Sequence, residues 1–187
     1  MKKIFLTILI MTFSLNVISQ QKDVSVEKSI YGIQTGILGV WIHSEIKLNS
    51  KIALRTEVGL DSGIFGGSYY SHTNFILFPT LTVEPRFYYN LNKRNKKSKT
   101  IFRNSGNFLT LKMNYTPDIF VISNLKNISI APSISIIPKW AIKRTFGKHF
   151  TFETGAGLGY RKYFLKNTSK NSKEAVLDLH VRVGYTF

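Results

Sequence analysis

The chain alternates apolar and polar residues with a period of two over most of its length, and helical periodicity is nearly absent from residue 30 onward. Successive side chains of a β-strand point to opposite faces, so this pattern predicts strands with one apolar and one polar face. The C-terminal segment shows it best. Its apolar row is Ala175, Leu177, Leu179, Val181, Val183, Tyr185 and Phe187, and its other row is Val176, Asp178, His180, Arg182, Gly184 and Thr186.

Seven segments follow this pattern and are separated by polar loops. They cover residues 30–43, 51–62, 74–91, 106–117, 127–143, 149–165 and 174–187. Most are longer than the usual strand of about 5 or 6 residues. Antiparallel sheets of soluble proteins also alternate, and a soluble barrel of the lipocalin type would turn its apolar face inward. Segment length, the meander and an export signal together favour an all-β fold, a transmembrane antiparallel up-and-down β-barrel.

The export signal is the N-terminal pattern of two lysines followed by a short apolar run. Lys2 and Lys3 precede the run IFLTILIMTFSL, and Val17 and Ser19 fit the small residues behind which signal peptidase cuts. The run is too short to cross a bilayer as a helix, which takes about 20 residues. We therefore expect residues 1–19 to be a signal peptide rather than a core helix, and residues 20–187 to be a single barrel domain.

Bacterial single-chain barrels have an even number of strands, so an eighth strand is expected near the N-terminus in addition to the seven segments. It is either a short strand at 22–29 or the result of a tight turn near 37–39 that divides the first segment. The second choice is favoured because Ile33 and Ile37 lie on one parity, whereas Val40 and Ile42 lie on the other. Eight strands are predicted.

Two segments share a proline-marked pattern, PTLTVEPRFYYNLNKR at 79–94 and PSISIIPKWAIKR at 132–144. The corresponding pairs are Pro79 with Pro132, Pro85 with Pro138, Arg86 with Lys139 and Phe87 with Trp140. Proline removes a ladder hydrogen bond and is normally confined to edges or bulges. A closed barrel has no edges, so bulges are predicted at these prolines.

Three features resemble a known superfamily: the signal peptide, the alternation and the terminal aromatic residue. Together they resemble the small outer-membrane β-barrels of the OmpX and OmpA membrane-domain type. The stretches EPRFYYNLNKR, SGNFLTLKMNY and FETGAGLGYRKYF also resemble uncharacterised outer-membrane barrels of Bacteroidota. The resemblance covers nearly all of the chain after the signal peptide, and it implies an architecture but hardly an activity.

The same resemblance implies an orientation in the cell outer membrane of a Gram-negative bacterium. Val183, Tyr185 and Phe187 look like the C-terminal assembly signal that the barrel assembly machinery reads during insertion, which places that end in the periplasm. Counting back along the strands then puts 62–73, 118–126 and 166–173 outside the cell. It puts 44–50, 92–104 and 144–148 in the periplasm, with the aromatic residues near Phe87 and Trp140 at the interface.

The predicted lumen face is rich in charge. It holds Arg55, Glu57, Glu84, Arg86, Lys112, Lys139, Glu153, Arg161, Asp178, His180 and Arg182. Side chains just fill an eight-stranded barrel, and buried charges must be paired, so an ion-pair network that plugs the lumen is predicted. The alternative is a narrow polar channel. Because four acids face more bases, some basic side chains are expected to reach toward the mouths.

No catalytic or metal site is predicted, and no cofactor. The histidines are His43, His72, His149 and His180, which are scattered singly without metal-ligand spacing. His72 follows Ser71 without a nearby acid, and His180 shares its face with Asp178 without an obvious serine nucleophile. Lipid-modifying enzymes exist on this scaffold, so an activity on lipopolysaccharide remains the alternative.

The chain is strongly basic, which bears on its partners. Without Lys2 and Lys3, 24 Lys and Arg face 10 Asp and Glu, a net charge of +14. A secretion signal argues against nucleic acid and favours outer-membrane lipid. Lys166, Lys170 and Lys173 are candidate contacts to lipopolysaccharide phosphates, and the basic turn 92–104, which lacks an acid, is expected to stay mobile. The sequence thus predicts a monomeric, non-enzymatic barrel with a structural or surface-interaction role.

Overall fold

The computed structural model describes residues 24–37, 39–67, 70–125, 128–165 and 172–187, and the predicted signal peptide lies outside them. Nearly all regular structure is β. The strands are β1 (Ser29–Gly36), β2 (Gly39–Lys47), β3 (Ile52–Gly67), β4 (Tyr70–Tyr88), β5 (Asn107–Thr116), β6 (Ile122–Ser123), β7 (Ser133–Phe146), β8 (Phe150–Tyr163) and β9 (Lys173–Thr186). Two short helices, α2 (Leu91–Lys96) and η2 (Phe102–Asn104), lie between β4 and β5. Neither these nor any other helix of the described residues is long and apolar enough to span a membrane.

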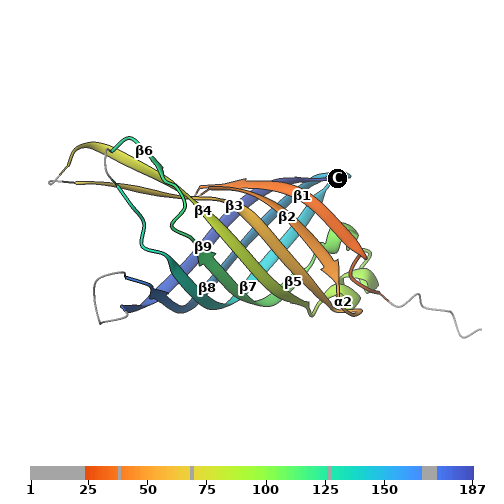
Figure 1. Ribbon diagram of the computed structural model, residues 1–187. Coiled ribbons are helices and arrows are strands. Elements are labelled where there is room, and N and C mark those ends of the chain that lie inside the picture. The colour runs from red at the N-terminus through yellow and green to blue at the C-terminus, as the bar shows by residue number, and fades with distance from the viewer. Residues whose placement is uncertain (1–23, 38, 68–69, 126–127, 166–171) are drawn as a thin grey trace, which may run out of the picture.

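Eight of the strands close into a ring by antiparallel pairing of sequence neighbours. β1 pairs with β9 at Gly32 and Thr186, which joins the two ends of the sheet. The short β6 lies outside the ring and extends the sheet beside β4 at Ile76 and Leu77. Figure 1 shows the tilted strands wrapped around one axis and the β3–β4 hairpin projecting from one end. The predicted eight-stranded up-and-down barrel is confirmed.

A tight turn between β1 and β2 supplies the hidden strand. Gly36 pairs with Gly39, and the turn shifts the parity, so that Ile33 and Ile42 both point outward. Gly39 has a φ of 149°, and a side chain there would collide with the Leu60 carbonyl oxygen. Glycine is therefore required at this position. The alternative strand at 22–29 is not formed over its described residues, where β1 begins at Ser29.

The prolines do not produce the predicted bulges. Pro85 keeps register with Leu54 of β3, and Pro138 keeps register with Leu111 of β5. Each proline lacks an N–H, so the pairing is interrupted on one side only, toward β5 for Pro85 and toward β8 for Pro138. In both cases it resumes beyond the proline in the same register. The Thr110 hydroxyl donates to the Pro85 carbonyl at 2.9 Å and satisfies it.

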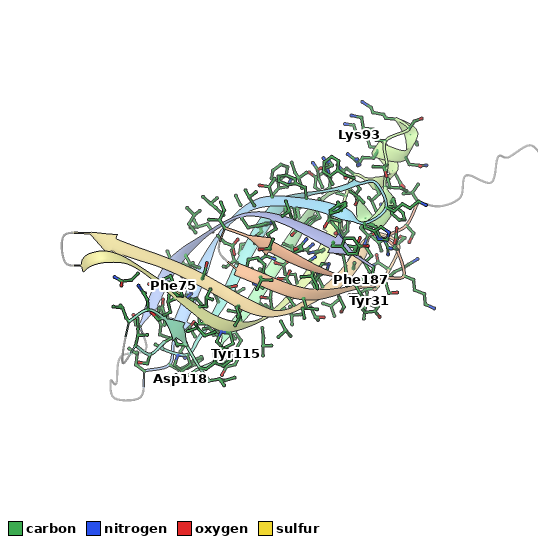
Figure 2. The ribbon with its side chains drawn as sticks, turned by 90° about the horizontal axis from the view of Figure 1, so that it is seen from above. Tyr31, Phe75, Lys93, Tyr115, Asp118 and Phe187 are labelled. Atoms are coloured by element: carbon green, nitrogen blue, oxygen red, sulfur yellow. The ribbon has the colours of Figure 1, made fainter. Side chains whose placement is uncertain are left out.

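The barrel is polar inside and apolar outside. Along β7 the burial alternates residue by residue, with Lys139 and Lys143 inside and Ile136 and Trp140 outside. Exposed aromatic residues gather near both ends of the apolar band, and Figure 2 labels Tyr31 and Phe187 toward one end and Phe75 and Tyr115 toward the other. This arrangement is the reverse of a lipocalin-type soluble barrel.

The two ends of the barrel differ. We call the end at which β9 finishes the basal end, and it carries the turns between β2 and β3, β4 and β5, and β7 and β8. The opposite, distal end carries the connections β1–β2, β3–β4, β5–β7 and β8–β9. The loops predicted for each side of the membrane thus fall at opposite ends.

The basal end is closed by a lid, which we define as residues 24–28 and 89–106. Val26 and Leu91 pack with Tyr88 and Phe108 in an apolar cluster across this mouth. The Glu27 amide donates to Asn104 Oδ1 at 2.7 Å. The turn 92–104 holds no acid of its own, but Glu27 from the N-terminal segment supplies one, 3.8 Å from Arg103.

Candidate functional site

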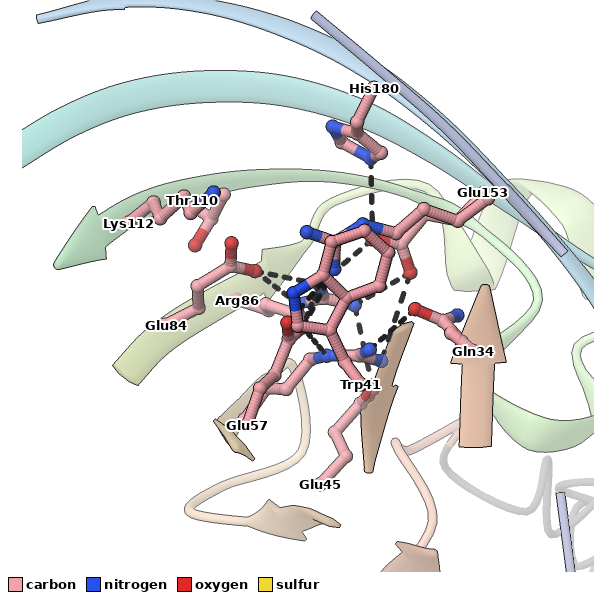
Figure 3. A network of polar contacts seen from close by, with 12 residues as sticks. Gln34, Trp41, Glu45, Glu57, Glu84, Arg86, Thr110, Lys112, Glu153 and His180 are labelled. Atoms are coloured by element: carbon pink, nitrogen blue, oxygen red, sulfur yellow. Dashed lines mark hydrogen bonds and ion pairs between the residues drawn. The ribbon is translucent and has the colours of Figure 1, made fainter. Parts of the chain in front are cut away.

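The barrel interior is built around Arg86. Arg86 and Glu84 are two residues apart on β4, so both point inward, and the Arg86 Nη2 lies 2.6 Å from Glu84 Oε2. From the opposite wall, Glu153 of β8 accepts two hydrogen bonds from Arg86, each 2.9 Å long. Figure 3 shows both carboxylates turned toward this guanidinium, which also lies 4.5 Å from the centre of the Phe108 ring. Arg86 therefore ties together two walls of the barrel.

A second cluster lies beside it on β1, β3 and β9. Arg55 bonds Glu57 on its own strand and donates to Gln34 Oε1 at 2.6 Å. Arg182 of β9 reaches the same Glu57 through two hydrogen bonds, of 2.9 and 3.1 Å, across 125 residues of sequence. The Arg182 guanidinium also lies 3.9 Å from the centre of the Trp41 ring. Charge-assisted bonds of this kind are among the strongest in proteins.

Glu45 organises the basal layer. Its carboxylate accepts from the Tyr88 hydroxyl at 2.8 Å, from Asn104 Nδ2 at 2.6 Å and from Lys143 Nζ at 3.0 Å. Asn104 belongs to the lid, so Glu45 joins the lid to the charged interior. Sequence reasoning missed Glu45 because residues 44–50 were assigned to a turn. The alternation of Trp41, His43 and Glu45 is the signal that could have found it.

Asp178 organises the distal layer. Lys112 Nζ donates to it at 2.8 Å and Lys139 Nζ at 2.5 Å. Lys139 and His180 lie flat against β8, where a side chain at Gly157 or Gly155 would collide with them. The glycines of β8 therefore make room for the long side chains of the neighbouring strands.

The interior charges balance. Six carboxylates, namely Glu45, Glu57, Asp61, Glu84, Glu153 and Asp178, face the six cations Arg55, Arg86, Lys112, Lys139, Lys143 and Arg182 among the described residues. The predicted excess of base is therefore not found within the barrel, because Glu45 and Asp61 supply the acids that the sequence estimate omitted. Burying so many ions is tolerable only when each has partners.

Most of the sequence-predicted lumen residues converge. The structure brings together Arg55, Glu57, Glu84, Arg86, Lys112, Lys139, Glu153, Asp178, His180 and Arg182. Arg161 stands apart at the distal mouth, partly exposed, 3.5 Å from Glu174. Five further residues join this interior that were not predicted to face it, namely Glu45, Lys143, Gln34, Tyr88 and Asn104.

Above the network the barrel contains an open space. A cavity of about 720 Å³ is lined inside by Trp41, Asp61, Lys112, Asp178 and Arg182. Its lining also includes the outward-facing Trp140, Ala156 and Leu179, so part of this volume lies on the outer face beside the small residues of β8. The interior part ends at the ion pairs of Arg182 with Glu57 and of Lys139 with Asp178.

The histidines do not form a catalytic array in the described residues. His180 Nδ1 lies 2.9 Å from Lys139 Nζ, and its Nε2 lies 3.4 Å from Glu153, so both nitrogens face charged groups. His149 contacts the Thr186 carbonyl at 2.8 Å and stacks on Tyr185. His43 is buried, and neither ring nitrogen has a hydrogen-bond partner among the described groups. The side chain of His72 lies outside the described residues, and those described hold no group of three potential metal ligands.

The remaining predicted sites lie at the two ends. Lys173 is the exposed first residue of β9, and Lys166 and Lys170 lie outside the described residues. Val183, Tyr185 and Phe187 form an exposed row at the basal end of β9. There Tyr185 packs edge-on against Phe150 and Phe187, with ring centres 5.7 and 5.6 Å apart.

Comparison of the chain with protein-family models, with curated proteins and with solved structures gave no match. The function is therefore inferred from the geometry of the barrel.

Proposed function

We propose that the chain is a non-enzymatic outer-membrane β-barrel with a closed interior, and that it acts through its distal end as a structural or surface-interaction protein. The observation that carries this proposal is the reversal of the two faces. Arg55 and Glu153 are fully buried in the interior, whereas Leu158 and Leu177 on the outer face are both 64% exposed. Such a surface is compatible with hydrocarbon rather than with water.

The outer face supports a membrane location in a second way. Large apolar side chains cover the middle of β7 and β9, and exposed aromatic residues gather toward either end. Aromatic girdles that flank an apolar band are typical of transmembrane barrels. An apolar band of this extent on a monomer in water would be an aggregation liability.

The interior supports a closed barrel. Arg86 and Arg182 bridge opposite walls through Glu153 and Glu57, and Glu45 connects this network to the lid. An ion crossing the barrel would have to break several buried ion pairs, each of which becomes costly once a partner is lost.

The distal end supports an interaction role. Here β3 and β4 continue beyond the ring, β6 adds to their sheet, and the exposed Ile119 and Phe120 follow β5. Loops on a rigid scaffold commonly carry binding functions. In the orientation that the C-terminal row suggests, this end faces the exterior, and Lys173 would meet lipopolysaccharide phosphates.

Insertion and conductance test the proposal together. The protein without residues 1–19 should sediment with lipid vesicles, migrate faster in a detergent gel when unboiled, and leave a planar bilayer at its baseline conductance. A detergent-free soluble monomer would overturn the membrane location. Steady ion flux that falls when Lys139 or Asp178 is changed would overturn the closed interior, and acyl transfer or hydrolysis that is lost on changing His180 or His72 would establish an enzyme.

A further inference from the structure

The basal end carries a ring of exposed cations. Lys28 precedes β1, Lys47 and Lys51 flank the turn between β2 and β3, the basic residues of 93–99 follow β4, and Arg144 and Lys148 stand at the turn between β7 and β8. We call these residues the basic rim. The interior charges cancel, so the rim accounts for much of the excess charge of the chain.

The basic rim has almost no acid to neutralise it. In the described part of the basal surface, the half-buried Glu27 is the accessible side-chain carboxylate, and it pairs with Arg103. Glu45 lies nearby but is buried and engaged with Lys143 inside the barrel. An unpaired row of cations attracts anions, and this attraction falls off within about 8 Å at physiological salt.

Two arginines of the rim form its most structured part. Arg144 lies on the outward face of β7 and is held by the Gly106 carbonyl at 3.0 Å and by Asn107 Oδ1 at 2.7 Å. Arg94 of α2 is held by the Thr100 carbonyl at 2.9 Å. Asn90 joins the two arginines, because its carbonyl accepts from the Arg94 amide at 3.0 Å and its side chain accepts from the amide of Asn107 at 2.8 Å. Neither guanidinium has a carboxylate partner among the described residues, although each is partly buried and fixed in place by neutral oxygens.

A tyrosine and a tryptophan border this arginine pair. Asn107, which holds Arg144, donates to the Tyr89 hydroxyl at 3.4 Å, and Trp140 Nε1 donates to the same hydroxyl at 2.8 Å. Trp140 faces outward among exposed apolar residues such as Leu109. Tyrosine and tryptophan in such a position mark the boundary between hydrocarbon and head groups. The arginines thus lie at head-group height.

We propose that the basic rim binds the head groups of anionic phospholipids in the leaflet next to it, and that Arg94 and Arg144 form the principal site. This inference rests on the proposed membrane location and adds the lipid class that the basal end selects. Arginine suits this role because its planar fork can bind two phosphate oxygens together. A wall polymer or a soluble protein would first meet the helix α2, where Figure 2 labels Lys93. Arg144 instead adjoins the aromatic boundary, because Asn107 links it to Tyr89 and Trp140.

The outward tryptophan offers a direct measurement. Trp140 lies beside the arginine pair, and Trp41 is buried inside the barrel. The protein should be reconstituted into vesicles in which either phosphatidylglycerol or phosphatidylcholine carries bromine on its acyl chains, and the quenching of fluorescence then reports which lipid is next to Trp140. We expect phosphatidylglycerol to be preferred several-fold. Replacing Arg94→Gln and Arg144→Gln together should reduce this preference about five-fold, to nearly equal quenching by the two lipids.

A matched variant removes the same net charge from the other end. Lys162→Gln with Lys173→Gln changes two distal cations and should leave the preference at Trp140 intact. Equal quenching by the two lipids in the unmodified protein would overturn the inference while leaving the membrane location standing. Quenching by neither lipid would overturn the membrane location itself. Equal quenching together with rim-dependent sedimentation on peptidoglycan would assign the rim to the cell wall instead.

Discussion

At the scale of single residues, the fold depends on where each long polar side chain finds its partner. Arg86 and Arg161 are both arginines on polar faces of strands. Arg86 is enclosed by Glu84 and Glu153, whereas Arg161 is about one third exposed and shares Glu174 with the Tyr163 hydroxyl. Arg86 therefore links strands inside the barrel, whereas Arg161 forms a partly exposed ion pair at its distal mouth.

This difference can be measured. Arg86→Met removes the cation that both Glu84 and Glu153 hydrogen-bond, so the free energy of unfolding should fall by about 3–5 kcal/mol. The matched change Arg161→Met removes an exposed partner and should cost about 1 kcal/mol or less. Denaturant unfolding in lipid vesicles gives both values. Similar losses for the two variants would mean that the interior pairs contribute no more than surface ones.

Glycine at residue 157 makes a second prediction at this scale. Gly157→Ala would place a methyl group against both the Lys139 side chain and the Pro138 carbonyl oxygen, so the ion pair of Lys139 with Asp178 and the neighbouring strand would have to shift. A loss of about 1–3 kcal/mol in the free energy of unfolding is expected from this overpacking. Ala156→Gly, one residue away on the outer face, is the control and should cost about 1 kcal/mol at most. If the two changes cost the same, Gly157 is not needed for the seating of Lys139.

At the scale of elements, β9 carries both the apolar row and the end of the chain. The Phe187 amide donates a hydrogen bond to the Tyr31 carbonyl at 3.0 Å, and the Phe187 ring packs against the Tyr185 ring. Deleting Phe187 should slow insertion in a reconstituted assembly assay and leave the free energy of unfolding of the finished barrel nearly unchanged. Phe146→Ala, at the same rim on β7 and equally exposed, should insert at the normal rate. Equal insertion rates for all three proteins would refute the assembly role.

The outward row of β9 also predicts a dependence on depth. Leu179→Arg places a charge in the middle of the apolar band and should cost about 2–4 kcal/mol. Ala175→Arg lies near the distal end of the same row and should cost about 0–1 kcal/mol. Measurement of both variants in lipid vesicles checks the depth assignment, and an inexpensive Leu179→Arg would mean that this row does not meet hydrocarbon.

The strands were predictable from sequence because inward residues are charged and outward residues are apolar. The two kinds therefore alternate clearly along each strand. The strand boundaries in β5, β7 and β8 lie within a few residues of those expected, except that β7 starts at Ser133 rather than at 127. Pairing across the barrel was not predictable, since nothing in the sequence around Glu45 indicates Asn104 or Lys143 as its partners. The lid escaped prediction for the same reason, because its two segments, 24–28 and 89–106, meet only in three dimensions.

At the scale of the whole molecule, the lid and the charged interior form one unit. Asn104 bonds both the Glu27 amide and Glu45, so Asn104→Ala removes two links at once. Amide hydrogen exchange at residues 101–106 should then become faster, while exchange in β7 and β8 stays slow. Lys96→Ala in the exposed helix α2 should leave both unchanged. Uniformly faster exchange throughout the barrel would show that the lid is not a separate layer.

The long reach of the interior bonds has a consequence for how such a molecule comes into being. Arg182 of β9 bonds Glu57 of β3 across 125 residues, and Lys143 of β7 bonds Glu45 of β2 across 98, so each bond forms only when early and late strands of the chain come together. A partly closed barrel would therefore expose unpaired charged side chains to the lipid hydrocarbon, and such an intermediate would have a very high free energy. Entry into the bilayer and joining of β1 to β9 should accordingly happen as a single cooperative event, slow in proportion to its non-local contacts.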